Sequence, residues 1–167
     1  ISNCTEAPLL YEHDGVPPEP PTLLGTSPAS PSFEEVPDIL GQTEPLASVE
    51  VWLNGTCEGA PVEVVQASAG GSFDAPVTAI PNDTLTISAR ATDSAGNVSE
   101  CSAPELYLHD DIPPSTPVID ATSPASPSSF LSPVVHGASD PSVRVEIYDN
   151  AACQGADIGF ADASAGG

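Results

Sequence analysis

The chain has 167 residues and a formal net charge of −22 at pH 7, because 24 acidic residues outnumber two arginines. Such a charge repels nucleic acid and anionic lipid surfaces, and no segment approaches the roughly 18 apolar residues that span a bilayer, so we expect no nucleic-acid partner and no membrane insertion. With 20 prolines, 13 glycines and few helix-forming residues, the composition favours short strands joined by turns.

Six segments alternate apolar and polar residues and are bounded by Pro, Gly, Asn or Asp, which is the pattern of short β-strands. The predicted strands cover residues 37–41, 47–53, 61–65, 73–80, 84–91 and 105–109. Because side chains alternate between the two faces of a strand, we expect the core to contain Val49, Val51, Leu85, Ile87 and Ala89. The period alone does not decide which face Trp52 takes, although we expect this aromatic ring to serve packing.

An internal repeat with an offset of 96 residues is the strongest signal in the chain. The heptapeptide Thr-Ser-Pro-Ala-Ser-Pro-Ser at 26–32 recurs letter for letter at 122–128, and 24 of the 55 positions aligned from residue 17 onward are identical. The same offset places Tyr148 opposite Trp52, so both repeats keep an aromatic residue there. A period of this length assigns a whole domain to each repeat.

The repeat divides the chain into three parts. Residues 1–16 are predicted to be the terminal strand of a preceding repeat, 17–112 a complete repeat, and 113–167 the first part of a following repeat. That last part contains no counterpart of 72–97, where two strands are expected. We expect those strands either from sequence beyond this segment or from a neighbouring subunit that donates them.

Two motifs resemble those of a known group of domains. Residues 91–97 read Ala-Thr-Asp-Ser-Ala-Gly-Asn, and a Pro-Pro-x-x-Pro connector precedes the heptapeptide in both repeats. These features resemble the turns and inter-repeat segments of bacterial immunoglobulin-like tandem-repeat domains from large secreted or cell-surface proteins. The resemblance implies an all-β fold of tandem immunoglobulin-like β-sandwich repeats, each of about 96 residues.

Each repeat carries two cysteines, which indicates a disulfide inside each secreted domain. In the complete repeat these are Cys57 and Cys101. Cys153 maps onto Cys57, and Cys4 maps onto Cys101 once a single residue is inserted, so both are expected to bond to neighbouring repeats. The alternative is a bond from Cys4 to Cys153 between subunits. No two cysteines have the spacing of zinc ligands, so we expect no zinc.

Acidic residues near the predicted repeat boundary are candidate metal ligands. Asp110 and Asp111 precede the proline connector, and Asp93 lies on a turn that could approach it. Carboxylates on loops suit calcium, so a calcium ion that stiffens the joint is the only cofactor considered. The Tyr-x-His-Asp sequence at 107–110 repeats 11–14 but has no nucleophile with an associated base. We therefore expect no catalytic residues and no enzyme.

Five residues are candidate glycosylation sites: Ser27, Ser30, Ser123, Ser126 and Asn82. The serines belong to the proline-rich heptapeptides, which we expect to be extended and exposed, or to act as stiff spacers. Asn82 begins one of four Asn-x-Ser/Thr sequons.

Together these features predict a structural repeat of an extracellular filament, stalk or surface fibre, whose partners are neighbouring repeats or subunits. The alternative is an adhesin-type module that binds a glycan or a protein on another surface. Loops that differed between repeats would favour the alternative, yet residues 54–59 closely match 150–155.

Overall fold

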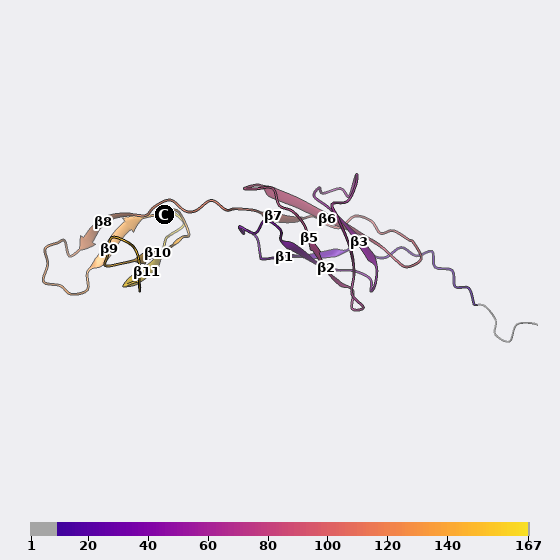
Figure 1. Ribbon diagram of the computed structural model, residues 1–167, viewed down its shortest axis with the longest axis horizontal. Helices are drawn as coiled ribbons and strands as arrows, with labels where there is room; N and C mark the ends of the chain where they lie inside the picture. Colours follow the sequence, from indigo (N-terminus) through magenta and orange to yellow (C-terminus); the bar gives the residue numbers. More distant parts are fainter. Residues whose placement is uncertain (1–9, 167) are drawn as a thin grey trace, which may run out of the picture. The chain divides into compact units, whose positions relative to one another are not determined.

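The computed structural model describes residues 10–166, and over this range it is all-β, with eleven strands and no helix. It therefore contains no helix able to cross a membrane in the described part of the chain. The chain forms two compact units, Ile1–Asp111 (unit 1) and Ile112–Gly167 (unit 2), shown in Figure 1.

Unit 1 contains two antiparallel sheets. Its strands are β1 (Thr22–Ser27), β2 (Asp38–Gln42), β3 (Ser48–Trp52), β4 (Glu63–Gln66), β5 (Ser72–Pro76), β6 (Thr84–Thr92) and β7 (Glu105–Leu108). One sheet has the order β1-β2-β5 and the other the order β4-β3-β6-β7. All six predicted strands are present, although the one expected at 73–80 ends at Pro76 and the one expected at 61–65 begins at Glu63.

The core of unit 1 draws on both sheets. Val49, Val51, Leu85, Ile87 and Ala89 are all buried, which confirms the predicted core. The same cluster also contains Ile39 of β2, Phe73 and Ala75 of β5 and Tyr107 of β7. Because the inner residues of both sheets meet in one cluster, unit 1 encloses a single hydrophobic core.

The heptapeptide at 26–32 is largely exposed, as expected, but it is not a spacer between repeats. Its first two residues end β1, a strand that was not predicted, and its last residue, Ser32, bridges in parallel to His109. The Ser32 amide donates to the Leu108 carbonyl at 3.1 Å, and the Leu108 amide donates to Ser30 Oγ at 2.9 Å. The segment therefore lies along the end of β7 in its own repeat.

Unit 2 repeats the first four strands of unit 1. They are β8 (Val118–Ser123), β9 (Val134–Ala138), β10 (Arg144–Ile147) and β11 (Gly159–Asp162). Each begins 96 residues after its counterpart, as 118 does after 22, and the pairings β8-β9 and β10-β11 keep the registers of β1-β2 and β3-β4. Even the bulge of β1 at Leu23/Gly25 recurs at Ile119/Ala121.

The N-terminal segment, residues 1–16, is expected to form the terminal strand of a preceding repeat. Its described part, residues 10–16, forms no strand. The rest of that segment, with Cys4, lies outside the described residues.

Candidate functional site

A disulfide lies on the face of the β4-β3-β6-β7 sheet that points away from the core of unit 1. Cys57 and Cys101 are bonded, as predicted, with their Cα atoms 5.8 Å apart. The bond joins the loop after β3 to the segment between β6 and β7. Cys57 is buried, and its sulfur lies 3.4 Å from Ser88 Oγ on β6. The bond thus holds the loop after β3 against the outer face of β6.

Trp52 is buried beneath this loop and not within the core. Val51 and Trp52 are adjacent in β3 yet both are buried, so they lie on opposite faces of the strand. The indole Nε1 donates to the Gly59 carbonyl at 3.1 Å, and the Arg90 guanidinium carbon lies 5.7 Å from the ring centroid. The tryptophan therefore packs between the loop and a cation, which confirms the packing role expected for it.

The segment that leaves unit 1 is held to the unit by hydrogen bonds to backbone and side-chain acceptors. The His109 side chain is buried, and its Nδ1 accepts from the Asn82 amide at 3.1 Å. Asn82 Oδ1 in turn accepts from the Asp111 amide at 3.1 Å, and the Asp110 amide donates to Ser32 at 2.9 Å. Residues 109–111 are thus tied both to the turn before β6 and to the heptapeptide.

The segment that leads into unit 1 approaches the opposite end of β6. Asn97 Nδ2 lies 3.4 Å from the Asp14 carbonyl and 2.8 Å from Asp93 Oδ2. The Asn97 side-chain hydrogen bond, with further bonds from the backbone of the turn, holds the pKa of the Asp93 carboxyl below its ordinary value. Asp93 therefore stays ionised in the fold and organises the turn at 93–97.

The three candidate calcium ligands do not meet within the repeat. Asp93 follows the last residue of β6, whereas Asp110 and Asp111 follow β7, whose Leu108 pairs with Thr84 at the start of β6. Nine residues of strand separate the two ends, about 30 Å. Residues 10–166 contain no group of three His, Cys, Asp or Glu side chains able to hold a metal ion.

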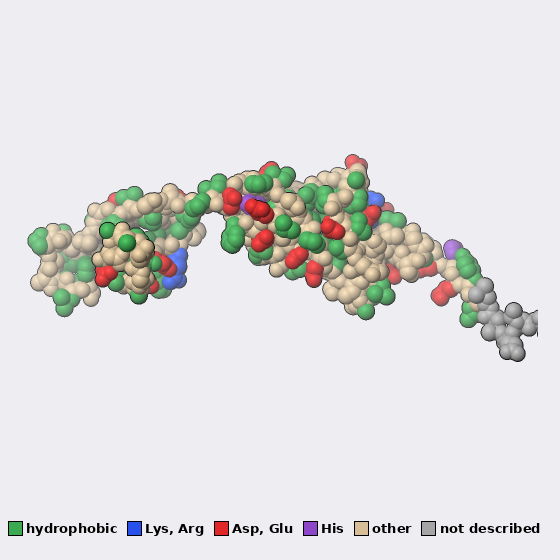
Figure 2. All heavy atoms as spheres, in the orientation of Figure 1, with side chains coloured by type: hydrophobic (Ala, Val, Ile, Leu, Met, Phe, Trp, Pro, Cys, Tyr) green, Lys and Arg blue, Asp and Glu red, His purple; other side chains and the backbone are tan. Residues whose placement is uncertain are grey.

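The candidate glycosylation residues are all exposed, namely Ser27, Ser30, Ser123, Ser126 and Asn82. Two of them also make structural hydrogen bonds, because Ser30 accepts from β7 and Asn82 accepts from the exit segment. The acidic side chains spread over the visible surface of both units, whereas Lys and Arg colour is confined to small areas (Figure 2).

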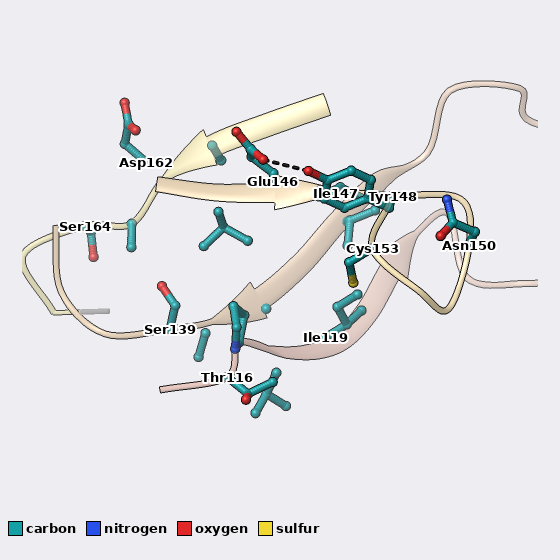
Figure 3. Close-up of a pocket in the computed structure, with 18 residues that line it drawn as sticks. Thr116, Ile119, Ser139, Glu146, Ile147, Tyr148, Asn150, Cys153, Asp162 and Ser164 are labelled. Atoms are coloured by element: carbon teal, nitrogen blue, oxygen red, sulfur yellow. Dashed lines mark hydrogen bonds between the residues drawn. The ribbon is translucent and has the colours of Figure 1, made fainter. Parts of the chain in front are cut away.

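Unit 2 contains an apolar groove between its two pairs of strands. The groove has a volume of about 490 Å³, and its lining includes Val118, Val135, Val145, Ile147, Tyr148 and Cys153. Figure 3 shows the side chains of Ile119 and Cys153 directed into the same hollow. Cys153 is a free and exposed thiol, unlike its counterpart Cys57.

Sequence reasoning missed the attachments of residues 109–111 and the groove. One signal for the attachments was available, since Ser30 and Ser32 recur unchanged as Ser126 and Ser128 although a simple spacer needs no particular serine.

The chain matches no protein-family model, no curated protein and no solved structure.

Proposed function

We propose that the chain is part of an extracellular array of immunoglobulin-like β-sandwich repeats that acts as a filament, stalk or surface fibre and has no catalytic role. One observation carries the proposal. The strand starts, the pair registers and the bulge of unit 1 recur in unit 2 at a constant offset of 96 residues. A chain that builds the same element twice at a fixed period is suited to extension by repetition.

Hydrogen bonds at both ends of unit 1, at Asp14 and at residues 109–111, support a defined joint between repeats. Asp110 is the 96-residue counterpart of Asp14. In an array, the carbonyl of Asp110 is therefore placed to meet the Asn97 counterpart of the next repeat, while its own amide stays bonded to Ser32. Each joint is then held on both sides of the proline connector.

The disulfide and the charge fit an exposed extracellular position. A disulfide persists in oxidising compartments, and the chain-wide net charge of −22 keeps neighbouring fibres apart by repulsion.

The test is peptide mapping of the native material under non-reducing and reducing conditions. We expect Cys57-type and Cys101-type peptides to be linked within each repeat of one chain. Free thiols at both positions would place the protein in a reducing compartment and refute the proposal. Selective binding of the purified chain to a glycan or protein array would instead support the adhesin alternative.

A further inference from the structure

The groove of unit 2 is lined by residues whose counterparts are fully covered in unit 1. Ile39, Val49 and Val51 are each 0% exposed in unit 1. Their counterparts Val135, Val145 and Ile147 are only half-buried. The same apolar surface is therefore covered in one unit and accessible to solvent in the other.

Three strands cover this surface in unit 1. β5 pairs with β2, β6 pairs with β3, and β7 pairs with β6. In the described part of unit 2, β9 pairs with β8 alone and β10 with β11 alone. One edge of β9, where β5 would pair, and one edge of β10, where β6 would pair, thus present backbone donors and acceptors beside an apolar groove. Strand addition requires such an edge.

We propose that unit 2 is a strand-acceptor site, and that its occupant is a segment with the strand pattern of residues 72–111, supplied by the repeat array. The inference rests on the proposed function only for the source of this segment. By the registers of unit 1, Val145 pairs with the residue equivalent to Ala91 and Ile147 with the one equivalent to Ala89. The β5-like strand adds to β9 in the register in which Phe73 faces Gly41.

Unit 2 keeps the glycine against which the aromatic ring of the β5-like strand packs in unit 1. In unit 1, a Cβ atom on Gly41 would lie 2.1 Å from the Phe73 ring, so the ring packs where β2 has no side chain. The counterpart Gly137 lines the groove. The acceptor strand therefore also has a glycine at this position, although a Cβ atom there would lie 2.3 Å from the carbonyl oxygen of Val118 in β8.

Charge complementarity supports a β6-like strand with a central arginine. Arg90 of β6 is the register partner of Glu50 in β3, and its guanidinium group lies over the Trp52 ring. Unit 2 keeps both features, as Glu146 and Tyr148, whose hydroxyl donates to the Glu146 carboxylate at 2.7 Å. An acid beside an aromatic ring is a favourable place for a guanidinium group, and Glu146 already lies 3.7 Å from the Arg144 guanidinium of its own strand.

The exposed thiol of Cys153 completes the match, because Cys57 at the equivalent position bonds to Cys101. With oxidised glutathione as the oxidant, the Cys153 thiolate attacks its disulfide and releases one glutathione thiolate. The thiolate equivalent to Cys101 then attacks the Cys153 sulfur and releases the second. Two thiols and one glutathione disulfide thus become one protein disulfide and two reduced glutathiones.

The test uses the full chain with Cys4→Ser and a synthetic peptide of residues 72–111, labelled with fluorescein, in a glutathione redox buffer. We expect a one-to-one complex in fluorescence anisotropy, a fall of at least about tenfold in the alkylation rate of Cys153, and a cross-link from Cys153 to the peptide cysteine.

The variant Val145→Asp should bind the peptide with an affinity that is lower by about tenfold or more. Leu131→Asp is the matched control, because Leu131 is 97% exposed and does not line the groove.

A charge exchange tests the register without disturbing the apolar lining. Arg90→Glu in the peptide should weaken binding, and Glu146→Arg in the chain should restore it. A peptide that binds Val145→Asp as well as the parent chain, a cross-link absent at Cys153, or a chain dimer that covers the groove and excludes the peptide would each overturn the acceptor site. If the acceptor site fails but the native disulfides lie within each repeat, the proposed array is still supported. If the peptide binds but the native material has free thiols at these positions, only the proposed array is refuted.

Discussion

Removal of the Cys57–Cys101 disulfide should cost unit 1 much of its stability. The bond spans 44 residues. In the chain-entropy description, a loop of that length removes about 13 cal/mol/K from the unfolded chain, or about 4 kcal/mol at 25 °C. A typical domain is stable by only about 5–15 kcal/mol, so the double variant Cys57→Ser/Cys101→Ser should lie near the limit of folding.

The assay is urea unfolding followed by the fluorescence of Trp52, which is the only tryptophan and lies beneath the disulfide-bonded loop. With a slope of about 1–2 kcal/mol per molar urea, the midpoint should fall by about 2–4 M in the double variant. Cys153→Ser is the control, since that thiol is exposed and unbonded, and it should leave the midpoint unchanged. A fall of less than about 0.5 M in the double variant would refute the loop-closure reasoning.

Three further changes test the packing and the turns of unit 1. Gly41→Ala places a methyl group against the Phe73 ring and should lower the free energy of unfolding by about 1–3 kcal/mol in urea titrations. Tyr107→Phe removes a 2.7 Å hydrogen bond to a backbone carbonyl from a fully buried ring and should cost about 1 kcal/mol by the same measurement. Hydrogen bonding lowers the pKa of Asp93 in the fold, so the ionised carboxylate stabilises unit 1 above the ordinary pKa of 3.8, and this stabilisation is lost as the pH falls through the lowered pKa. Asp93→Ala should therefore flatten the decrease in melting temperature that occurs below about pH 4.

Matched controls separate these effects from general disturbance. Gly55→Ala meets only Thr86 Cγ2 at an ordinary 3.5 Å and should be nearly neutral. Tyr11→Phe makes the same chemical change at a side chain that is 87% exposed and should not alter stability. Equal losses for Gly41→Ala and Gly55→Ala, or for the two tyrosine variants, would contradict the packing described for Gly41 and Tyr107. An unchanged acid transition in Asp93→Ala would contradict the role of that carboxylate.

Local sequence patterns were sufficient for the elements that keep a strict period. The alternation in β3 and β6 identified the inner residues Val49, Val51, Leu85, Ile87 and Ala89, because a strand's faces follow directly from its period of two. The 96-residue repeat and the even cysteine count likewise predicted the Cys57–Cys101 bond. β1 was missed because its bulge at Leu23/Gly25 breaks the alternation that marks a strand.

Other features depend on which strands become neighbours, and only the tertiary structure decides that. Trp52 is buried on the outer face of β3 because the disulfide holds a loop over it, which no property of the strand itself reveals. Antiparallel pairing of β6 with β7 places Asp93 and Asp110 at opposite ends of unit 1, so the two carboxylates do not meet within one repeat. The sequence by itself determined the period, the strands other than β1 in the complete repeat, and the inner residues of β3 and β6. Pairing between distant strands determined the ends at which the turns meet the connectors, because strand direction is a property of the sheet.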